Sequence, residues 1–487
     1  DVIDGEEAYD FTWVGKRAAM VEANTPIRKT LRPCPDESKN WETTENLYIE
    51  GDNLDALKLL QESYLNSVKM IYIDPPYNTG NDSFVYPDDY SMDVEEYDES
   101  IEYRDDDGNI NFRKNAETNP RFHSDWCSMM YSRLRVARSL LREDGVIFMS
   151  IDDGEVDNLK KICNSIFGEQ NFVAQFVWIK KKKGSHLSKT IRNMTEYVLC
   201  FAKDSSQIEL FGEKAYSNKQ QPLVKRTNSR KRLVIPAGVI RTTLVDEVYE
   251  PGTYGKGTSA LDFVSNIVVE AGIVKNEVVV EGPFVWTQAK LDMELTLGTQ
   301  VNLSNRFGFN VLRSDQADKI KRPSTLIDGK TGVGTNEDAY SEVQGIFKNE
   351  AIMSYPKPSS LIKFLVNSVT YFTQDGLVMD FFAGSSTTAH AVMQLNAEDG
   401  GNRKYIMVQL PEETDEKSEA FKAGYKTISD IGKERIRRAG EKIKAEVEEA
   451  NAKLKDGDEL KAVPDIGFRV LKVDSTNMKD VYYAANE

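Results

Sequence analysis

The 487-residue chain lacks long hydrophobic runs and has few metal-binding side chains. No apolar stretch approaches the roughly 18 residues that cross a bilayer. The N-terminus, DVIDGEEAYD, is acidic rather than signal-like, so we expect a cytoplasmic protein without a membrane segment. Four scattered cysteines form no CxxC pair, which predicts reduced thiols. Three dispersed histidines do not suggest a zinc site, and we expect no metal.

Several common enzyme signatures are also missing. A complete GxGxxG is absent, and no Ser-His-Asp or Cys-His set has a persuasive context. Gly329-Lys330-Thr331 superficially suggests a phosphate loop, but the upstream glycine position is Ser324 and no strand leads into it. These absences argue against a nucleotide-hydrolysing motor. The length predicts two or three domains, and the 40% hydrophobic and 29% charged residues are ordinary for a globular protein.

The net charge of −16 argues at first against a nucleic-acid partner, but the charge is strongly segregated. Residues 90–109 are heavily acidic, whereas residues 180–232 contain fourteen Lys or Arg against four acids. Such a basic stretch can neutralise phosphates locally whatever the global charge. The alternative is a solvated basic face without a ligand.

Apolar strands alternate with amphipathic helices in two parts of the chain, which predicts an α/β parallel sheet. The expected strands are Leu47–Glu50, Met70–Ile73, Val146–Ile151, Leu377–Phe381 and Lys404–Leu410. Between the two parts, the sequence loses the regular alternation of strands and helices and contains many short polar connections. We therefore divide the chain into residues 1–203, an inserted region at 204–348, a second α/β part at 349–425, and a charged helix with a small β tail at 426–487.

The first stretch that indicates chemistry is Asp74-Pro75-Pro76-Tyr77, directly after an apolar strand. Two prolines cannot donate backbone hydrogen bonds, so they end the strand and stiffen the turn after it. A primary amine on an aromatic ring is a poor nucleophile because its lone pair is delocalised. Rigid acceptors such as the Asp74 carboxylate and the Pro75 carbonyl would draw the nitrogen toward a nucleophilic geometry. Tyr77 would stack on a flat base, worth about 1–3 kcal/mol.

The second stretch is LVMDFFAGSSTTAHAV, residues 377–392. A strand runs into Asp380, a tight loop comes next, and a helix starts near Thr387. In a doubly wound sheet this kind of turn lies at the carboxyl edge, where a small cofactor binds. Gly384 would allow close approach of the backbone, and Asp380 would hold a cationic or hydroxyl group. Taken alone, the stretch is equally compatible with a tight packing turn.

In combination and in this order, the two motifs resemble the β-class of DNA adenine-N6 methyltransferases. The first is similar to their DPPY motif and the second to their S-adenosylmethionine loop. Further stretches resemble the modification subunit of type III restriction–modification systems: FTWVGKRAA, EGDNLDALKLL, RFHSDWCSMMYSRL, SYPKPSSLI, YIMVQLPE and DIGKERIRRAGEKI. The resemblance implies a Rossmann-like, mixed but mostly parallel seven-stranded sheet of permuted motif order, with an inserted target-recognition domain.

The same resemblance implies how the catalytic residues act. Asp74 and the Pro75 carbonyl accept hydrogen bonds from the adenine amine, Pro76 adds rigidity, and Tyr77 stacks on the flipped base. The amine then attacks the sulfonium methyl in line, with no covalent enzyme intermediate. Cytosine-N4 methylation poses the same chemical problem, but Asp rather than Ser at position 74 favours adenine.

Cofactor-binding roles are implied for a further set of residues. Those expected to contact the methionine and adenosine portions are Asp380, Phe382 and Gly384, and those expected to close over the methionine end are Lys357 and Pro358. Asp52 would recognise the adenine of the cofactor, and either Gln409 or Glu412 would hold the ribose. Two departures from the family pattern are Ser386, in place of the commoner glycine, and Thr195, where a histidine is frequent.

The inserted region would be the target-recognition domain, and basic residues at its entrance would contact DNA phosphates. The candidates are Lys181, Lys182, Lys183, Arg226, Arg230, Lys231 and Arg232. Implied partners are double-stranded DNA, a second copy of the chain, and a restriction subunit with helicase and nuclease functions. A solitary methyltransferase and an inactive DNA specificity subunit remain alternatives.

Overall fold

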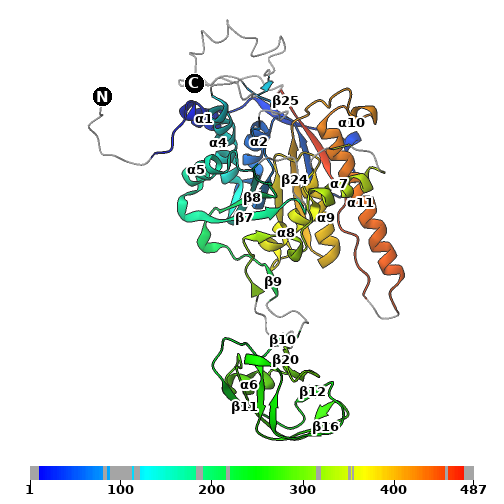
Figure 1. Cartoon of the computed structure of the whole chain (residues 1–487). Coiled ribbons are helices and arrows are strands. Elements are labelled where there is room, and N and C mark those ends of the chain that lie inside the picture. The colour runs from blue at the N-terminus through cyan, green and yellow to red at the C-terminus, as the bar shows by residue number, and fades with distance from the viewer. Residues whose placement is uncertain are drawn as a thin grey trace, which may run out of the picture. The chain divides into compact units, whose positions relative to one another are not determined.

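The computed structural model describes residues 10–79, 85–87, 112–114, 121–182, 190–214, 220–313, 320–348, 352–353, 356–455 and 459–475. Lys183 and the acidic segment 90–109 lie outside the described residues. The chain divides into two compact units (Figure 1). The larger unit comprises Asp1–Leu210 and Ser324–Glu487, and the smaller one comprises Phe211–Pro323.

A large mixed sheet forms the centre of the larger unit. Across the described part of the chain it has ten strands in the order β1-β25-β2-β24-β23-β3-β6-β8-β7-β22. The six strands from β25 to β6 run parallel, and β8 is antiparallel to both of its neighbours. Their bounds are β1 Lys29–Pro33, β2 Leu47–Glu50, β3 Val68–Ile73, β6 Leu141–Ile151, β7 Phe172–Ile179, β8 Thr195–Ala202, β22 Leu326–Ile327, β23 Asp375–Asp380, β24 Asn402–Gln409 and β25 Arg469–Ser475.

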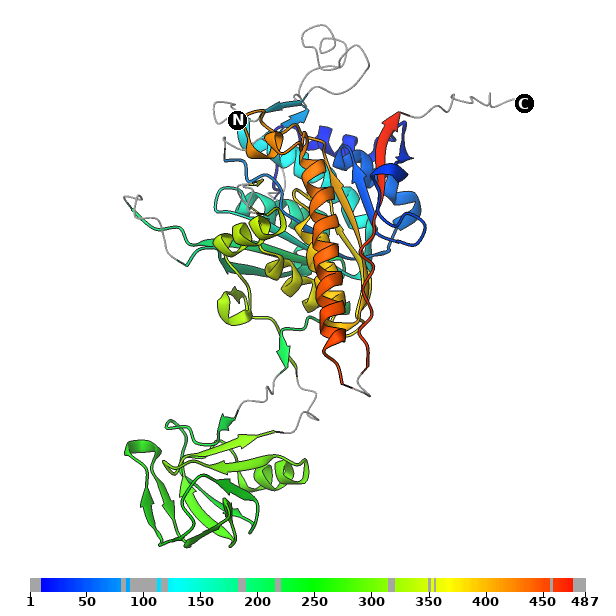
Figure 2. The same ribbon diagram turned by 90° about the vertical axis from the view of Figure 1, so that its right-hand side faces the viewer.

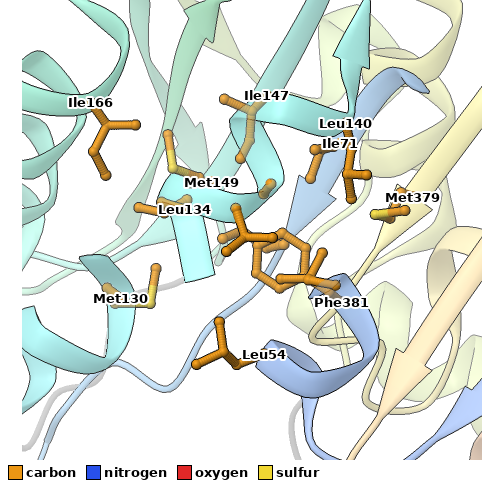
Figure 3. Packing of buried hydrophobic residues seen from close by; sticks show 14 of the residues in the cluster. Leu54, Ile71, Met130, Leu134, Leu140, Ile147, Met149, Ile166, Met379 and Phe381 are labelled. Atoms are coloured by element: carbon orange, nitrogen blue, oxygen red, sulfur yellow. The ribbon is translucent and has the colours of Figure 1, made fainter. Parts of the chain in front are cut away.

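Helices cover both faces of this sheet (Figure 2). One face packs against α1 Lys16–Asn24, α2 Asn53–Tyr64, α4 Phe122–Leu140 and α5 Val156–Phe167. The other face packs against α8 Ser359–Thr370, α9 Thr387–Asp399 and α11 Ile428–Ala452. The central strands are apolar on both sides because neither side meets water. In β3, for example, every residue except Lys69 is buried. Figure 3 shows the first core, with Leu54, Met130, Leu134 and Phe381 packed around Ile71 and Ile147.

The sheet brings together segments that lie far apart in the chain. Strand β23 pairs in parallel with β3, so that Val378 lies opposite Met70 and Met379 opposite Ile71. The loops after both strands therefore leave the sheet at the same carboxyl edge. This places Asp74-Pro75-Pro76-Tyr77 next to the loop after Asp380.

The sheet is wider than the seven strands expected from the sequence. Strands β1 and β25 extend one edge, and β22 extends the other. The C-terminal β tail is therefore not an appendage, because β25 pairs with β2 inside the main sheet. Residues 324–348 also belong to the larger unit, since β22 pairs with β7 and α7 Asn336–Ile346 contacts α11. The smaller unit is thus narrower at both ends than the expected 204–348.

The smaller unit is built mainly of short strands around its own apolar core. Its two larger sheets have the orders β10-β20-β19-β12-β17-β16-β13 and β11-β18-β15-β14, and β9 pairs with β21. The bounds are β9 Glu213–Lys214, β10 Gln221–Pro222, β11 Lys231–Ile235, β12 Ile240–Thr242, β13 Val248–Tyr249, β14 Gly252–Tyr254, β15 Leu261–Phe263, β16 Ile267–Glu270, β17 Ile273–Val274, β18 Val278–Gly282, α6 Gln288–Thr296, β19 Gln300–Leu303, β20 Phe309–Leu312 and β21 Ile320–Lys321.

The remaining short elements of the larger unit are β4 Val85–Pro87, β5 Phe112–Lys114 and α10 Glu419–Lys422. Among the helices of the described residues, none is both long enough and apolar enough to span a membrane.

Candidate active site

The two prolines after β3 differ in what their backbone carbonyls contact. Among the described residues, no partner is found for the Pro75 carbonyl, whereas the Pro76 carbonyl accepts a hydrogen bond from Trp126 Nε1 at 2.8 Å. Trp126 is fully buried on α4, so this contact fixes the orientation of the second peptide. Of the two proline carbonyls, that of Pro75 is therefore the one available to a ligand.

Asp74 is anchored through one of its two carboxylate oxygens. Oδ1 accepts from the Tyr77 hydroxyl at 2.9 Å and lies 2.9 Å from Lys357 Nζ. Lys357 Nζ also donates to the Tyr77 hydroxyl at 2.8 Å and lies 4.8 Å from the centre of its ring. Burial raises the pKa of Asp74, while the Lys357 ammonium opposes that rise. Lys357 therefore contacts the catalytic motif directly, a position that the sequence did not indicate.

Two residues that sequence reasoning missed extend this cluster. Glu196 Oε2 on β8 lies 3.2 Å from the Tyr77 hydroxyl, whose one proton it shares with the nearer Asp74 Oδ1, and 3.4 Å from Lys357 Nζ. Its Oε1 accepts from Lys180 Nζ at 2.9 Å. Burial would raise the pKa of Glu196, but Lys357 and Lys180 outweigh it and the pKa is lowered. A signal was present in the sequence, because Glu196 interrupts an otherwise apolar strand.

The loop after β23 is held in shape by Asp380. Its Oδ1 accepts from the Phe382 backbone N–H at 3.0 Å, and its Oδ2 accepts from the Thr388 hydroxyl at 2.5 Å. Burial raises the pKa of Asp380 to about 7. The side chain is 3% exposed and is not among the residues that line the pocket at this edge of the sheet. Asp380 thus acts on the loop itself.

The backbone of this loop adopts left-handed conformations at two positions. Gly384 has φ 50°, and a Cβ built there would meet no other atom closer than 4.0 Å, so the backbone is open to a ligand. Ser386 has φ 62° at the start of α9. Glycine adopts this region at no steric cost, which explains why the family more often has glycine there.

A buried charged network lies behind the loop. Arg435 on α11 donates to Ser385 Oγ at 2.8 Å, to Thr387 Oγ1 at 2.7 Å and to Glu342 Oε1 at 3.1 Å. Glu342 also accepts from the Ser359 hydroxyl at 2.9 Å, two residues after Lys357. Sequence reasoning missed both Arg435 and Glu342. Arg435 stands beside Ile431 and Ala439 on the buried side of α11, a position where an arginine is unusual.

The N-terminus of α2 forms the opposite wall of the site. Asp52 caps this helix, accepting from Leu54 N and Asp55 N through Oδ1. Its Oδ2 lies 3.0 Å from Arg133 Nη2 of α4. Asp52 is therefore the N-cap residue of α2.

The two candidates for holding the ribose differ in their contacts. Gln409 accepts from the Gly384 backbone N–H at 2.6 Å and donates to the Leu410 carbonyl at 3.0 Å, so both ends of its amide are engaged. For the Glu412 carboxylate, no partner is found among the described residues. Burial raises the pKa of Glu412 to about 7.

One pocket of about 340 Å³ unites these elements. It is lined by Asp52, Asn53, Asp74, Pro75, Pro76, Tyr77, Met129, Arg133, Met353, Lys357, Phe381, Phe382, Gly384, Gln409, Leu410, Glu412 and Ile428. Of the catalytic and cofactor-binding residues expected from the sequence, Asp380 and Pro358 are not on this wall. A volume of this order is typical of small-molecule sites.

The candidate DNA contacts are not equivalent. Arg230 donates to the Ala260 and Glu281 carbonyls and to Asp262, and Lys231 donates to the Phe284 carbonyl. Both side chains are therefore engaged within the smaller unit. Arg232 lies 4.0 Å from Glu281, and Lys182 lies 3.0 Å from Asp338. For the exposed Arg226 and the half-buried Lys181, no partner is found among the described residues.

Comparisons with known proteins show the family of the chain. The DNA methylase family of N6 and N4 methyltransferases matches residues 68–420. The chain is 33% identical over 451 residues to the type III restriction-modification enzyme StyLTI Mod subunit of Salmonella typhimurium, covering 92% of this chain and 65% of that protein. It is 33% identical to the EcoPI Mod subunit of Escherichia phage P1, with coverages of 88% and 68%. It is 31% identical to the EcoP15I Mod subunit of Escherichia coli, with coverages of 90% and 70%.

The chain therefore belongs to the DNA methylase family, and within it to the group of type III Mod subunits. It spans about two thirds of the length of these relatives. The large sheet is a Rossmann-like methyltransferase fold, in which the DPPY strand β3 precedes the cofactor strand β23 along the chain, as the sequence indicated.

Proposed function

We propose that this protein transfers a methyl group from S-adenosylmethionine to the N6 amine of an adenine flipped out of duplex DNA. One observation carries the proposal. Asp74 and Pro75 line the same pocket as the glycine loop after β23. The Asp74 carboxylate is anchored through Oδ1. The Pro75 carbonyl is rigid and has no partner among the described residues. An exocyclic amine and a methyl donor can therefore meet in one site.

The residues of the pocket fit S-adenosylmethionine. Gly384 offers open backbone, Phe381 and Phe382 offer apolar surface, and Glu412 offers a carboxylate that no other described residue engages. When bound, this cofactor supplies an electrophilic methyl group on a sulfonium. We assign the ribose hydroxyls to Glu412 rather than Gln409, because the Gln409 amide is committed to the loop.

The remaining cofactor assignments have the same basis. Asp52 lines the pocket, and we assign it to the adenine of the cofactor, with its orientation set by Arg133. Phe382 and Gly384 contact the cofactor directly. Asp380 supports it indirectly by holding the loop, which changes the direct contact expected from the sequence.

Asp74 and Pro75 act on the target amine by accepting hydrogen bonds from its two N–H groups. Because the two prolines stiffen the segment, with the neighbouring Pro76 carbonyl held by Trp126, and Oδ1 of Asp74 is held by Lys357 and Tyr77, both acceptors need little reorganisation. Tyr77 stacks on the base and retains it outside the duplex. No side chain needs to form a covalent bond to the substrate.

We assign DNA recognition to the smaller unit, residues 211–323, and phosphate contact foremost to Arg226 and Lys181. We further propose that the enzyme works in the cytoplasm on double-stranded DNA as a homodimer, with a restriction subunit that carries helicase and nuclease functions. The names of the Mod relatives, which are subunits of type III restriction-modification enzymes, support the restriction partner.

The test is to incubate the protein with S-adenosylmethionine and unmethylated genomic DNA, and to identify the methylated nucleoside by mass. Asp74→Ala is the control, and it should abolish transfer while leaving cofactor and DNA binding largely intact. N6-methyladenine from the wild type alone supports the proposal. N4-methylcytosine would overturn the target base but leave the mechanism standing. No methylated base, with DNA bound normally, would point to an inactive specificity subunit.

A further inference from the structure

Glu196 stands behind the catalytic residues rather than in the pocket. It is not among the lining residues, and its side chain is 9% exposed. Through one oxygen it nevertheless contacts both groups that hold Asp74, namely the Tyr77 hydroxyl and the Lys357 ammonium. Through the other oxygen it accepts a hydrogen bond from Lys180, the residue directly after the neighbouring strand β7. The proposed transfer reaction gives none of these contacts a purpose.

The contacts of Asp74 show what Glu196 can influence. Oδ1 is engaged by Lys357 and Tyr77, both at 2.9 Å. No partner of Oδ2 is found among the described residues, so this oxygen is available to a substrate amine. A partial rotation of the carboxylate would turn Oδ2 out of line with the Pro75 carbonyl. The pair of donors on Oδ1 prevents this rotation.

We propose that Glu196 is a positioning residue for methyl transfer, holding the Lys357 ammonium against Oδ1 of Asp74 so that Oδ2 remains free to accept a hydrogen bond from the target amine. This inference rests on the proposed function. Lys180 balances the charge of Glu196, so the cluster contains two carboxylates and two ammonium groups. A misplacement of about 1 Å in such a constellation can cost on the order of a hundredfold in rate.

The charge of Glu196 should also affect the pKa of Asp74, which gives a second way to test the inference. The groups that act on Asp74 are Lys357, Glu196 and Tyr77, together with Tyr72 on its own strand and Asp380 on the adjacent strand. Glu196 raises the pKa of Asp74 because like charges repel. Removing the Glu196 charge should lower that pKa. The acidic limb of the rate profile, where Asp74 becomes protonated, should then move to lower pH.

The experiment measures single-turnover methyl transfer to unmethylated genomic DNA as a function of pH, together with the Kd for S-adenosylmethionine. Glu196→Ala should lower the transfer rate by at least about tenfold and leave the cofactor Kd within about twofold. Glu196→Gln keeps an acceptor without the charge, so its rate should lie between those of wild type and Glu196→Ala. In both variants the acidic limb should shift downward. Glu398→Gln, which removes the exposed partner of Lys363, is the matched control and should behave as wild type.

A second variant separates positioning from folding. Glu196→Gln combined with Lys180→Met leaves no unpaired charge on Lys180, so it should fold and bind the cofactor as wild type does while still showing the downward pH shift. Unchanged rates in Glu196→Ala at every pH would overturn the inference and leave the proposed function intact. A parallel loss of rate and cofactor binding in the double variant would also overturn it, since that indicates a purely structural role. If the wild type itself transfers no methyl group, the proposed function fails and the inference falls with it.

Discussion

Helix α11 touches the proposed cofactor loop at a glycine, and filling that position should disturb the loop. A Cβ at Gly432 would stand 2.7 Å from Ser386 Oγ, 2.9 Å from the Tyr48 hydroxyl and 3.1 Å from the Gly384 carbonyl. Carbon–oxygen contacts below 3.0 Å are hardly ever seen, so at least Ser386 and Tyr48 must move. Two of the three neighbours belong to the loop that we assign to the cofactor.

The magnitude depends on two opposing effects. Alanine is favoured over glycine inside a helix by about 0.5–1 kcal/mol, whereas overpacking a tight core costs about 1–3 kcal/mol. Gly432→Ala should therefore lower the free energy of unfolding by about 1–2 kcal/mol. Displacing the Gly384 carbonyl should also weaken the binding of S-adenosylmethionine by about tenfold, equal to 1.4 kcal/mol.

Gly345 in α7 is the matched control, because a Cβ there would meet nothing within 4 Å. Gly345→Ala should stabilise the protein by about 0.5–1 kcal/mol and leave cofactor binding unchanged. The assays are urea unfolding and titration calorimetry with the cofactor. Adding Ser386→Gly to Gly432→Ala removes the closest contact and suits the φ of 62° at that position, so binding should recover. A Gly432→Ala variant as stable as Gly345→Ala, with wild-type affinity, would refute the reasoning.

Three further predictions concern charged side chains. Because burial raises the pKa of Glu412 to about 7, protonation should weaken cofactor binding as pH falls below about 7, and calorimetry of Glu412→Gln should show no such slope. The hydrogen bond from His390 and the charges of His390 and Arg435 outweigh burial and lower the pKa of Glu342 to about 2. The ionised carboxylate therefore stabilises the folded protein above the unfolded pKa near 4.5, and this stabilisation is lost as pH falls through about 2. Glu342→Gln should thus cost about 3 kcal/mol in urea unfolding at about pH 7, and the gap should narrow in acid. Arg226→Ala should weaken DNA binding and reduce its salt slope by about 1, whereas Arg230→Ala should chiefly destabilise the smaller unit.

Sequence reasoning succeeded where the physical cause acts within a few residues. The apolar run before Asp74 predicted β3, and the two prolines ended it. Both motifs lie at strand ends, so the α/β order placed them at the same edge of the sheet. The class of fold and the position of the pocket were therefore accessible without coordinates.

Tertiary structure decided the features that depend on contacts between distant segments. Lys357 and Tyr77 are 280 positions apart, and their hydrogen bond arises because α8, which begins just after Lys357, contacts β3. The choice between Gln409 and Glu412 for the ribose also depends on tertiary contacts. The loop after β23 engages the Gln409 amide, whereas no described residue engages the Glu412 carboxylate. Likewise, Arg230 is engaged within its own unit.

The same distinction between local and long-range effects explains the strands at the edges of the large sheet. The C-terminal strand β25 has the local sequence of a small β tail, and its place beside β2 is set by pairing across more than four hundred residues. Strand propensity is a local property, whereas the choice of partner depends on which edge the rest of the fold leaves open. The sequence alone thus indicated the chemistry that we propose for this protein, and the tertiary structure decided which side chains surround the proposed catalytic residues.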